Sequence, residues 1–349
     1  MRTYHREIIF SDKELTKGFR YKDIFQIKPS NFEKQPKSTN IKIYPLLLEY
    51  WSDSDENPIV ADPKLQKIKD FVSRNANQLN KKQSILNLLT SITNFNFFYY
   101  GNGIKWSIPF PEEITDEFNN ETSVESWDIY YYPKMADDLR ITEFTEVDYE
   151  SISLIKDYYY YTHPDIFSSI TFPKSIEQIL DSYYAVEGNK KKTIDAVLKL
   201  IKDGVEIFEK YKSLSFLSFI SAIETLVDLE YYEENKMIEY SCEKCKSLSS
   251  SHFVCTECGN PIWAVSYKFK EFLKKYISDT NGSISKFNKI YNLRSKIVHS
   301  GSLMLGENNI SVWEEPDKTK KEFIVHIETM QLSRLSLIKW LLSNRQEKQ

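Results

Sequence analysis

One arginine and one histidine, five residues apart, have the chemistry to bind an anion and move protons. Arg294 and His299 lie in the segment 283–301, SISKFNKIYNLRSKIVHSG. A guanidinium keeps its charge and binds phosphate oxygens through a planar fork of N–H groups. An imidazole gives and takes protons near neutral pH. The pair could therefore hold a phosphate and act as general acid or base beside it.

The helix that must carry this pair has an apolar face. At 100° per residue, one face is formed by Ile284, Phe287, Tyr291 and Val298. Arg294 lies in the middle of that face. Because burying a guanidinium is costly without partners, we expect Arg294 to line a cleft, pair with an acid or face another subunit.

The end of this helix decides where His299 points. His299 is about 140° round the helix from Arg294, so the two side chains converge only if the helix ends there. Gly301 predicts that end, since glycine suits a left-handed cap. A helix C-terminus also stabilises a protonated imidazole.

Four cysteines form a second group with chemistry to offer. They are Cys242, Cys245, Cys255 and Cys258. Their spacing, C-x2-C-x9-C-x2-C, is typical of a tetrahedral Zn²⁺ site with no position left for water. Gly259 allows a tight turn after the second pair. We predict a structural zinc ribbon over 240–262; four unconnected thiols, or a catalytic zinc in which His252 replaces a cysteine, are the weaker alternatives.

The secondary structure that positions these groups changes near residue 170. Before it, the pattern predicts helices over 63–72 and 82–93, a β-hairpin of 95–100 with 104–110 about the turn 101–103, and a strand over 127–132. After it, three- and four-residue spacing predicts helices over 176–186, 193–211, 214–229, 264–277, 284–299 and 323–344. The expected fold class is α+β: a mixed α/β domain over 1–170, then an all-α bundle over 175–345 with the ribbon inserted.

Composition limits the function. The 349 residues hold 46 basic and 50 acidic side chains, a net charge of -4, which excludes a generic polyanion binder. Residues 264–299 nevertheless carry eight cations against two acids, with aromatic residues between them, whereas residues 112–150 carry 13 acids against two cations. The basic segment could attract RNA, or could simply be solvated lysines; the acidic one is a solvated face or a mask for the basic one.

Targeting signals are not evident. The start, MRTYHREIIFSDKELTK, has no apolar core of a signal peptide. The longest apolar runs fall far short of the roughly 20 residues that a membrane span needs. We expect a cytoplasmic protein with no membrane partner.

The segment from Tyr291 to Gly301 resembles the signature helix of HEPN domains, in particular the ApeA-like group, whose motif is similar to Y-x-L-R-S-x-x-V-H-G. The helix around Glu224, with its Ala-x-Glu-x-Leu core, resembles the family's other recurrent segment. The resemblance covers roughly 175–345. Here Ser300 stands where the family often has glycine, and no tyrosine follows His299 closely, so regulation by nucleotidylation of such a residue is not supported.

The resemblance implies a metal-independent endoribonuclease of anti-phage, toxin–antitoxin or RNA-processing systems. It implies a homodimer whose two signature helices form one composite site on RNA, possible targets including tRNA, with a phage or antitoxin protein as a further partner. His299 would act on the 2′-hydroxyl, Arg294 would bind the scissile phosphate, and Ser295 would orient the pair. Tyr291 and Lys296 would support the site. Glu224, on the packing face of its own helix, is either a structural partner of Arg294 or a catalytic acid.

Other functions stay open at this stage. A non-catalytic module could use Arg294 and His299 to hold a nucleotide or an anion while the N-terminal half recognises a protein. A zinc hydrolase conflicts with the closed cysteine site. A DNA-binding regulator conflicts with a ribbon that has only Lys244 and Lys246 between its outer cysteines.

Overall fold

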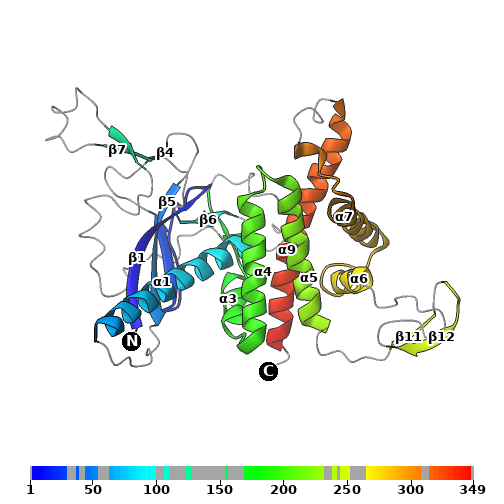
Figure 1. Ribbon diagram of the computed structural model, residues 1–349, viewed down its shortest axis with the longest axis horizontal. Coiled ribbons are helices and arrows are strands. Elements are labelled where there is room, and N and C mark those ends of the chain that lie inside the picture. Colours follow the sequence, from blue (N-terminus) through cyan, green and yellow to red (C-terminus); the bar gives the residue numbers. More distant parts are fainter. Residues whose placement is uncertain are drawn as a thin grey trace. The chain divides into compact units, whose positions relative to one another are not determined.

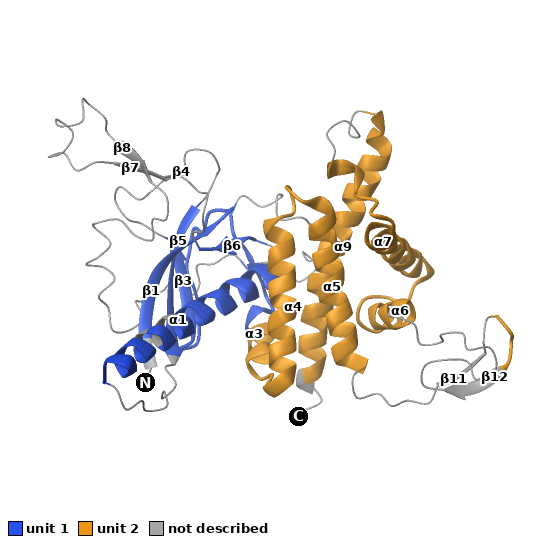
Figure 2. Ribbon diagram, viewed as in Figure 1, with its two compact units in different colours: residues 1–159, 163–177 blue, residues 160–162, 178–349 orange. Residues whose placement is uncertain are grey.

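The computed structural model (Figure 1) describes residues 2–29, 37–38, 44–53, 63–93, 95–99, 106–109, 123–126, 154–155, 169–231, 238–241, 244–251, 265–307 and 314–346. The chain divides into two compact units: unit 1 comprises residues 1–159 and 163–177, and unit 2 comprises 160–162 and 178–349 (Figure 2). The fold class is α+β, as predicted. No helix in the described part of the chain has the length and apolar character to cross a membrane.

Unit 1 is built on a five-stranded antiparallel sheet in the order β2-β3-β5-β1-β6. Its strands are β1 (Arg2–Ser11), β2 (Phe19–Tyr21), β3 (Phe25–Pro29), β5 (Tyr44–Asp53) and β6 (Phe97–Phe98). β1 and β5 pair over ten residues, from Arg2 opposite Asp53 to Ser11 opposite Tyr44. Residues 46–50 of β5 are all buried, so this central strand is covered on both faces.

Helix α1 (Pro63–Thr93) packs on this sheet and is continuous, so the prediction of two short helices is wrong. Its second half buries the apolar residues Ile85, Leu86, Leu88, Leu89 and Ile92. The polar stretch between the two predicted helices, residues 73–81, is helical as well, and its C-terminal end is bonded to the sheet. Gln78 and Lys82 donate to the Glu7 carboxylate of β1, at 2.8 and 2.5 Å.

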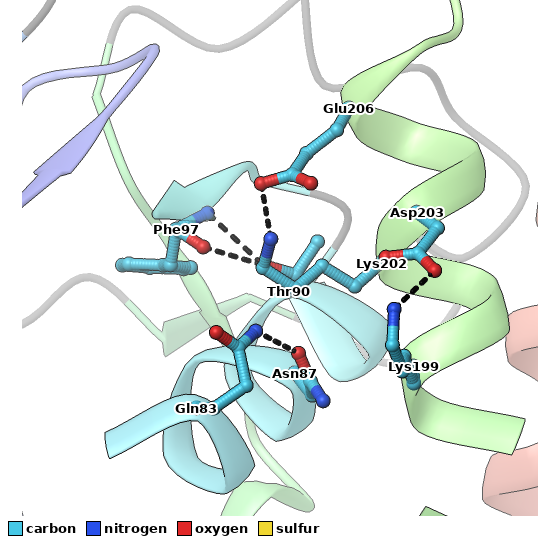
Figure 3. Close-up of polar contacts among 8 residues, drawn as sticks. All are labelled: Gln83, Asn87, Thr90, Phe97, Lys199, Lys202, Asp203 and Glu206. Atoms are coloured by element: carbon cyan, nitrogen blue, oxygen red, sulfur yellow. Dashed lines mark hydrogen bonds and ion pairs between the residues drawn. The ribbon is translucent and has the colours of Figure 1, made fainter. Parts of the chain in front are cut away.

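The predicted hairpin over 95–110 is also wrong. β6 pairs with β1, whereas β7 (Trp106–Pro109) pairs with β4 (Lys37–Ser38) and β8 (Ser123–Ser126). Phe97 is fully buried, and Thr90 of α1 accepts its N–H at 3.0 Å (Figure 3). Long-range burial of Phe97 therefore outweighs the local turn signal. The predicted strand over 127–132 lies outside the described residues; β9 (Leu154–Ile155) and β10 (Phe172–Pro173) form a short parallel pair.

Unit 2 contains the six predicted helices. They are α3 (Ile176–Tyr184), α4 (Gly188–Glu206), α5 (Lys212–Tyr231), α6 (Val265–Tyr276), α7 (Asn281–Ser300) and α9 (Pro316–Gln346). α9 begins seven residues before the predicted start at 323, and α4 is shifted toward the N-terminus by five residues at each end. A short 3-10 helix, η4 (Leu305–Glu307), and a hairpin of β11 (Ile238–Ser241) and β12 (Leu248–Ser251) complete it.

The core of unit 2 is formed by α4, α5 and α9, which lie side by side in Figure 1. α4 and α5 run antiparallel and very close: Ser215 Oγ donates to the Gly204 carbonyl at 2.7 Å. α9 runs parallel to α5, since Ser215 near the start of α5 bonds His326 and Glu230 near its end bonds Trp340, which lies farther along α9. Salt bridges along the surface of α4, such as Lys199 with Asp203 at 2.6 Å (Figure 3), add i,i+4 support.

Candidate functional site

Helix α7 is bounded by a cap at each end. The Thr280 side chain accepts the Ser283 N–H at 3.3 Å at the start. Gly301 closes the end in the left-handed conformation, with φ 62° and ψ 17°. The predicted glycine cap is confirmed, and it places His299 in the last turn of the helix.

The packing face of α7 differs from the predicted one. Its buried residues are Phe287, Ile290 and Ile297, whereas Val298 is 48% exposed. The helix is therefore rolled so that Ile290 and Ile297 take the positions assigned to Tyr291 and Val298. Arg294, four residues after Ile290 and three before Ile297, stays on the packing face.

Arg294 satisfies its charge with Glu224 of α5. Arg294 Nε lies 3.3 Å from Glu224 Oε1, and Nη2 donates to Oε2 at 3.5 Å. The side chains are 24% and 19% exposed. Arg294 therefore pairs with an acid, one of the three possibilities open for it. Arg294 Nη1 has no hydrogen-bond partner among the described residues.

Burial dominates the electrostatics of this pair. It raises the pKa of the Glu224 carboxyl above its usual range, and Asp228 adds to the rise while Arg294 opposes it. Tyr291 lies under the guanidinium, with Arg294 Cζ 5.8 Å from the ring centroid. Burial and Glu224 raise the pKa of the Tyr291 hydroxyl. Arg294 is thus held between a carboxylate and an aromatic face, with part of its fork still open.

His299 lies on a different side of α7. It is exposed, and within the described ranges no hydrogen bond or ion pair joins it to Arg294. Ser295 is half-buried and Lys296 is exposed. A single chain therefore positions the arginine on the packing face and the histidine toward solvent, without bringing them into contact.

The exposed stripe that includes His299 is basic. Lys289 and Lys296 are both exposed and precede His299 by ten and three residues, which places all three within about 80° of one another round the helix. Sequence reasoning counted these lysines only as part of a longer basic segment. The spacing 289, 296, 299 is the sequence signal that places Lys289 and Lys296 on the same side of the helix as the His299 imidazole.

The rest of the basic segment is partly neutralised by acids from other helices. Lys275 pairs with Glu230 of α5, and Lys286 pairs with Glu328 of α9 at 2.7 Å. With Glu224, these carboxylates add three negative charges that the linear count of 264–299 omitted. On α7 itself, the exposed cations Lys289 and Lys296 lie on the same side as His299.

The hairpin β11–β12 carries Cys245, the second cysteine of the first pair. Ser241 and Leu248 are its last paired residues, and Cys245 lies between them in the chain. Lys246, directly after Cys245, adopts a φ of +59°, a left-handed conformation that is uncommon for a lysine. Gly259, which follows Cys258 in the same way, lies outside the described residues.

The zinc site itself is only partly described. Cys245 is exposed, with Sγ 3.0 Å from Ser247 Oγ. The other three predicted ligands, Cys242, Cys255 and Cys258, lie outside the described residues. Among the residues that are described, no group of three or more His, Cys, Asp or Glu could hold a metal ion.

Comparisons of the chain with protein-family models, with curated proteins and with solved structures find no match.

Proposed function

We propose that the chain is a metal-independent endoribonuclease of the HEPN type that acts as a homodimer. The observation that carries the proposal is a guanidinium anchored by a carboxylate, with N–H groups to spare, on the same capped helix end as an exposed imidazole. Arg294 would bind the scissile phosphate through its open Nη1 edge and stabilise the charge that builds in the transition state. Glu224 would orient it.

In the proposed reaction, His299 removes the proton of a ribose 2′-hydroxyl, and that oxygen attacks the adjacent phosphorus. The bond from phosphorus to the 5′-oxygen breaks, and that oxygen takes a proton from a second imidazole or from water. The products are a 2′,3′-cyclic phosphate and a 5′-hydroxyl. Ser295 would help to orient the pair, and Lys289 and Lys296 would guide the RNA backbone to His299.

The dimer supplies what one chain lacks. Arg294 and His299 do not meet within one chain, so a second α7 would bring an arginine from one copy to a histidine of the other. The exposed side chains Val298 and Leu303, 48% and 61% exposed, flank His299 and offer apolar contact for such pairing. Val298→Asp should then yield a folded monomer with little cleavage, measured by sedimentation and an RNA assay. A V298D variant that stays dimeric and active would contradict this interface.

The four cysteines would bind one structural Zn²⁺ that stabilises the ribbon, whose roughly twenty residues are too few to fold alone. The RNA chemistry above uses no metal. A cytoplasmic role in anti-phage defence or as a toxin, with RNA such as tRNA as substrate and a phage or antitoxin protein as regulator, fits the proposed activity.

A second candidate is a non-catalytic module that binds a nucleotide or RNA. The ion pair of Arg294 with Glu224 favours it, because that pair already occupies part of the guanidinium. The two candidates differ in one experiment: incubation of total RNA in EDTA with wild type, His299→Ala and, as control, Ser302→Ala, which is exposed just after the cap. The nuclease predicts 2′,3′-cyclic phosphate ends with wild type and S302A only; uncut RNA with all three proteins contradicts it.

A further inference from the structure

A second feature of unit 2 is a cavity of about 400 Å³ away from the Arg294–Glu224 pair. It lies where α5 and α9 begin and where η4 crosses between them. Its apolar walls are Met304, Pro316 and Phe323, and Lys212, Lys320 and Glu322 also line it. The cavity has the size and the mixed lining of a small-ligand site.

Phe323 gives this cavity a fixed aromatic surface. Its side chain is 38% exposed, and its ring packs edge-on against buried Phe208, with the ring centroids 6.2 Å apart. Phe208 is in turn stacked on buried His326, with ring centroids 4.0 Å apart. The exposed part of Phe323 is therefore a ring held in place from behind, as a platform for a planar ligand requires.

The charges of the cavity favour an anion. Among the described lining residues the one acid is Glu322, which accepts the Leu305 N–H at 2.7 Å. Lys212 donates to the Glu209 carbonyl at 3.0 Å, and among the described residues no carboxylate pairs with Lys212 or Lys320. Glu307 already accepts the Ser213 N–H at the start of α5, and Asp317 lies in the first turn of α9, so the cations that an anion would meet in the cavity are Lys212 and Lys320. A planar aromatic group joined to a phosphate suits this combination.

We propose that this cavity binds one nucleotide of a single-stranded RNA, with its base stacked on Phe323 and its phosphate near Lys320 and Lys212. Met304, at the edge of the cavity, follows His299 by five residues, so their Cα atoms are at most about 18 Å apart. A few nucleotides of an extended single strand can span that distance. The inference rests on the proposed RNA substrate, and the cavity fixes the substrate a few nucleotides from the cleaved linkage.

Binding of a fluorescent 2′-O-methyl RNA octamer to the full-length protein tests this assignment. The 2′-O-methyl group blocks attack by the 2′-oxygen, so binding is measured whether or not the protein is a nuclease. Stacking on an aromatic ring is worth about 1–3 kcal/mol per base, so Phe323→Ala should weaken binding about fivefold or more. Ile324→Ala changes an exposed apolar neighbour outside the cavity lining and should bind like wild type.

The same binding assay tests the role of charge by comparing two lysines of α9. Lys320→Ala should weaken binding more than Lys318→Ala, since Lys318 pairs with Glu315 and does not line the cavity. If F323A is unstable, Phe323→Leu keeps the apolar volume and removes the aromatic face, and it should bind as weakly. Equal affinities for F323A and I324A, equal losses for K320A and K318A, or no binding by wild type would overturn the inference.

These results are separable from the proposed activity. If the protein cleaves unmodified RNA but Phe323→Ala does not change octamer binding, the proposed nuclease activity is supported and this subsite is refuted. If octamer binding depends on Phe323 but the protein does not cleave RNA, the subsite is supported and the proposed nuclease activity is refuted.

Discussion

The ion pair of Arg294 with Glu224 gives the sharpest test of how the site works, through Arg294→Ala and Glu224→Gln. At an effective dielectric of about 20, charges about 3.4 Å apart attract by about 5 kcal/mol. Burial cancels much of this attraction, because the pKa of Glu224 is raised rather than lowered. The net contribution of the pair to folding is therefore small, and the effects of the two variants should diverge.

Arg294→Ala leaves a carboxylate at 19% exposure without its cation, which should cost about 1.5–3 kcal/mol of unfolding free energy. Glu224→Gln removes the buried charge and keeps an oxygen acceptor, so it should change stability by about 1 kcal/mol or less. The raised pKa of Glu224 also determines how stability changes with pH. Folded Glu224 holds its proton to higher pH than the unfolded chain, so stability falls as pH rises from 4.5 to the folded pKa. E224Q should abolish that fall.

Cleavage should respond differently from stability. Loss of a phosphate-binding guanidinium should reduce single-turnover cleavage about 100-fold or more. E224Q leaves an unneutralised guanidinium and should lower KM, most clearly at low salt. The assays are urea unfolding followed by circular dichroism and cleavage of a fluorogenic RNA in EDTA. Lys286→Ala is the matched control, because it removes another salt bridge of α7, that with Glu328. A folded R294A that cuts RNA as fast as wild type would refute the role of Arg294.

Three further predictions concern stability and metal content. A Cβ at Gly204 would lie 2.6 Å from the Phe219 ring, so Gly204→Ala should lower the free energy of unfolding in urea by about 1–3 kcal/mol. Gly282 has open space around it, so Gly282→Ala should be neutral or stabilising. Equal effects of the two variants would refute the packing argument. Burial lowers the pKa of His326 to about 3 from 6.5. Below pH 6.5 this group should therefore lower the free energy of unfolding by up to about 1.4 kcal/mol per pH unit. His326→Phe should reduce this dependence of stability on pH, and an unchanged dependence would contradict the prediction. Elemental analysis should find one zinc per chain and none in Cys242→Ser, with lower thermal stability; zinc retained by C242S would contradict the four-cysteine site.

The sequence alone determined the local structure of unit 2. Three- and four-residue apolar spacing is a property of each helix by itself, so all six helices were predictable. Gly301 predicted the end of α7 because a left-handed cap costs glycine little, and the observed φ of 62° confirms it. Arg294 on an apolar face required a compensating partner, because its charge cannot be removed.

The tertiary structure decided which elements meet and which charges cancel. Glu224, 70 residues from Arg294, supplies the partner, and acids of α5 and α9 neutralise lysines that a linear count left positive. β6 pairs with β1 because burying Phe97 outweighs a nearby turn signal, and the buried strand β5 lacks an alternating pattern because both its faces are covered. Apolar spacing and capping act over a few residues, so sequence reveals them. Burial and charge pairing act between segments distant in the chain, so only the folded structure fixes them.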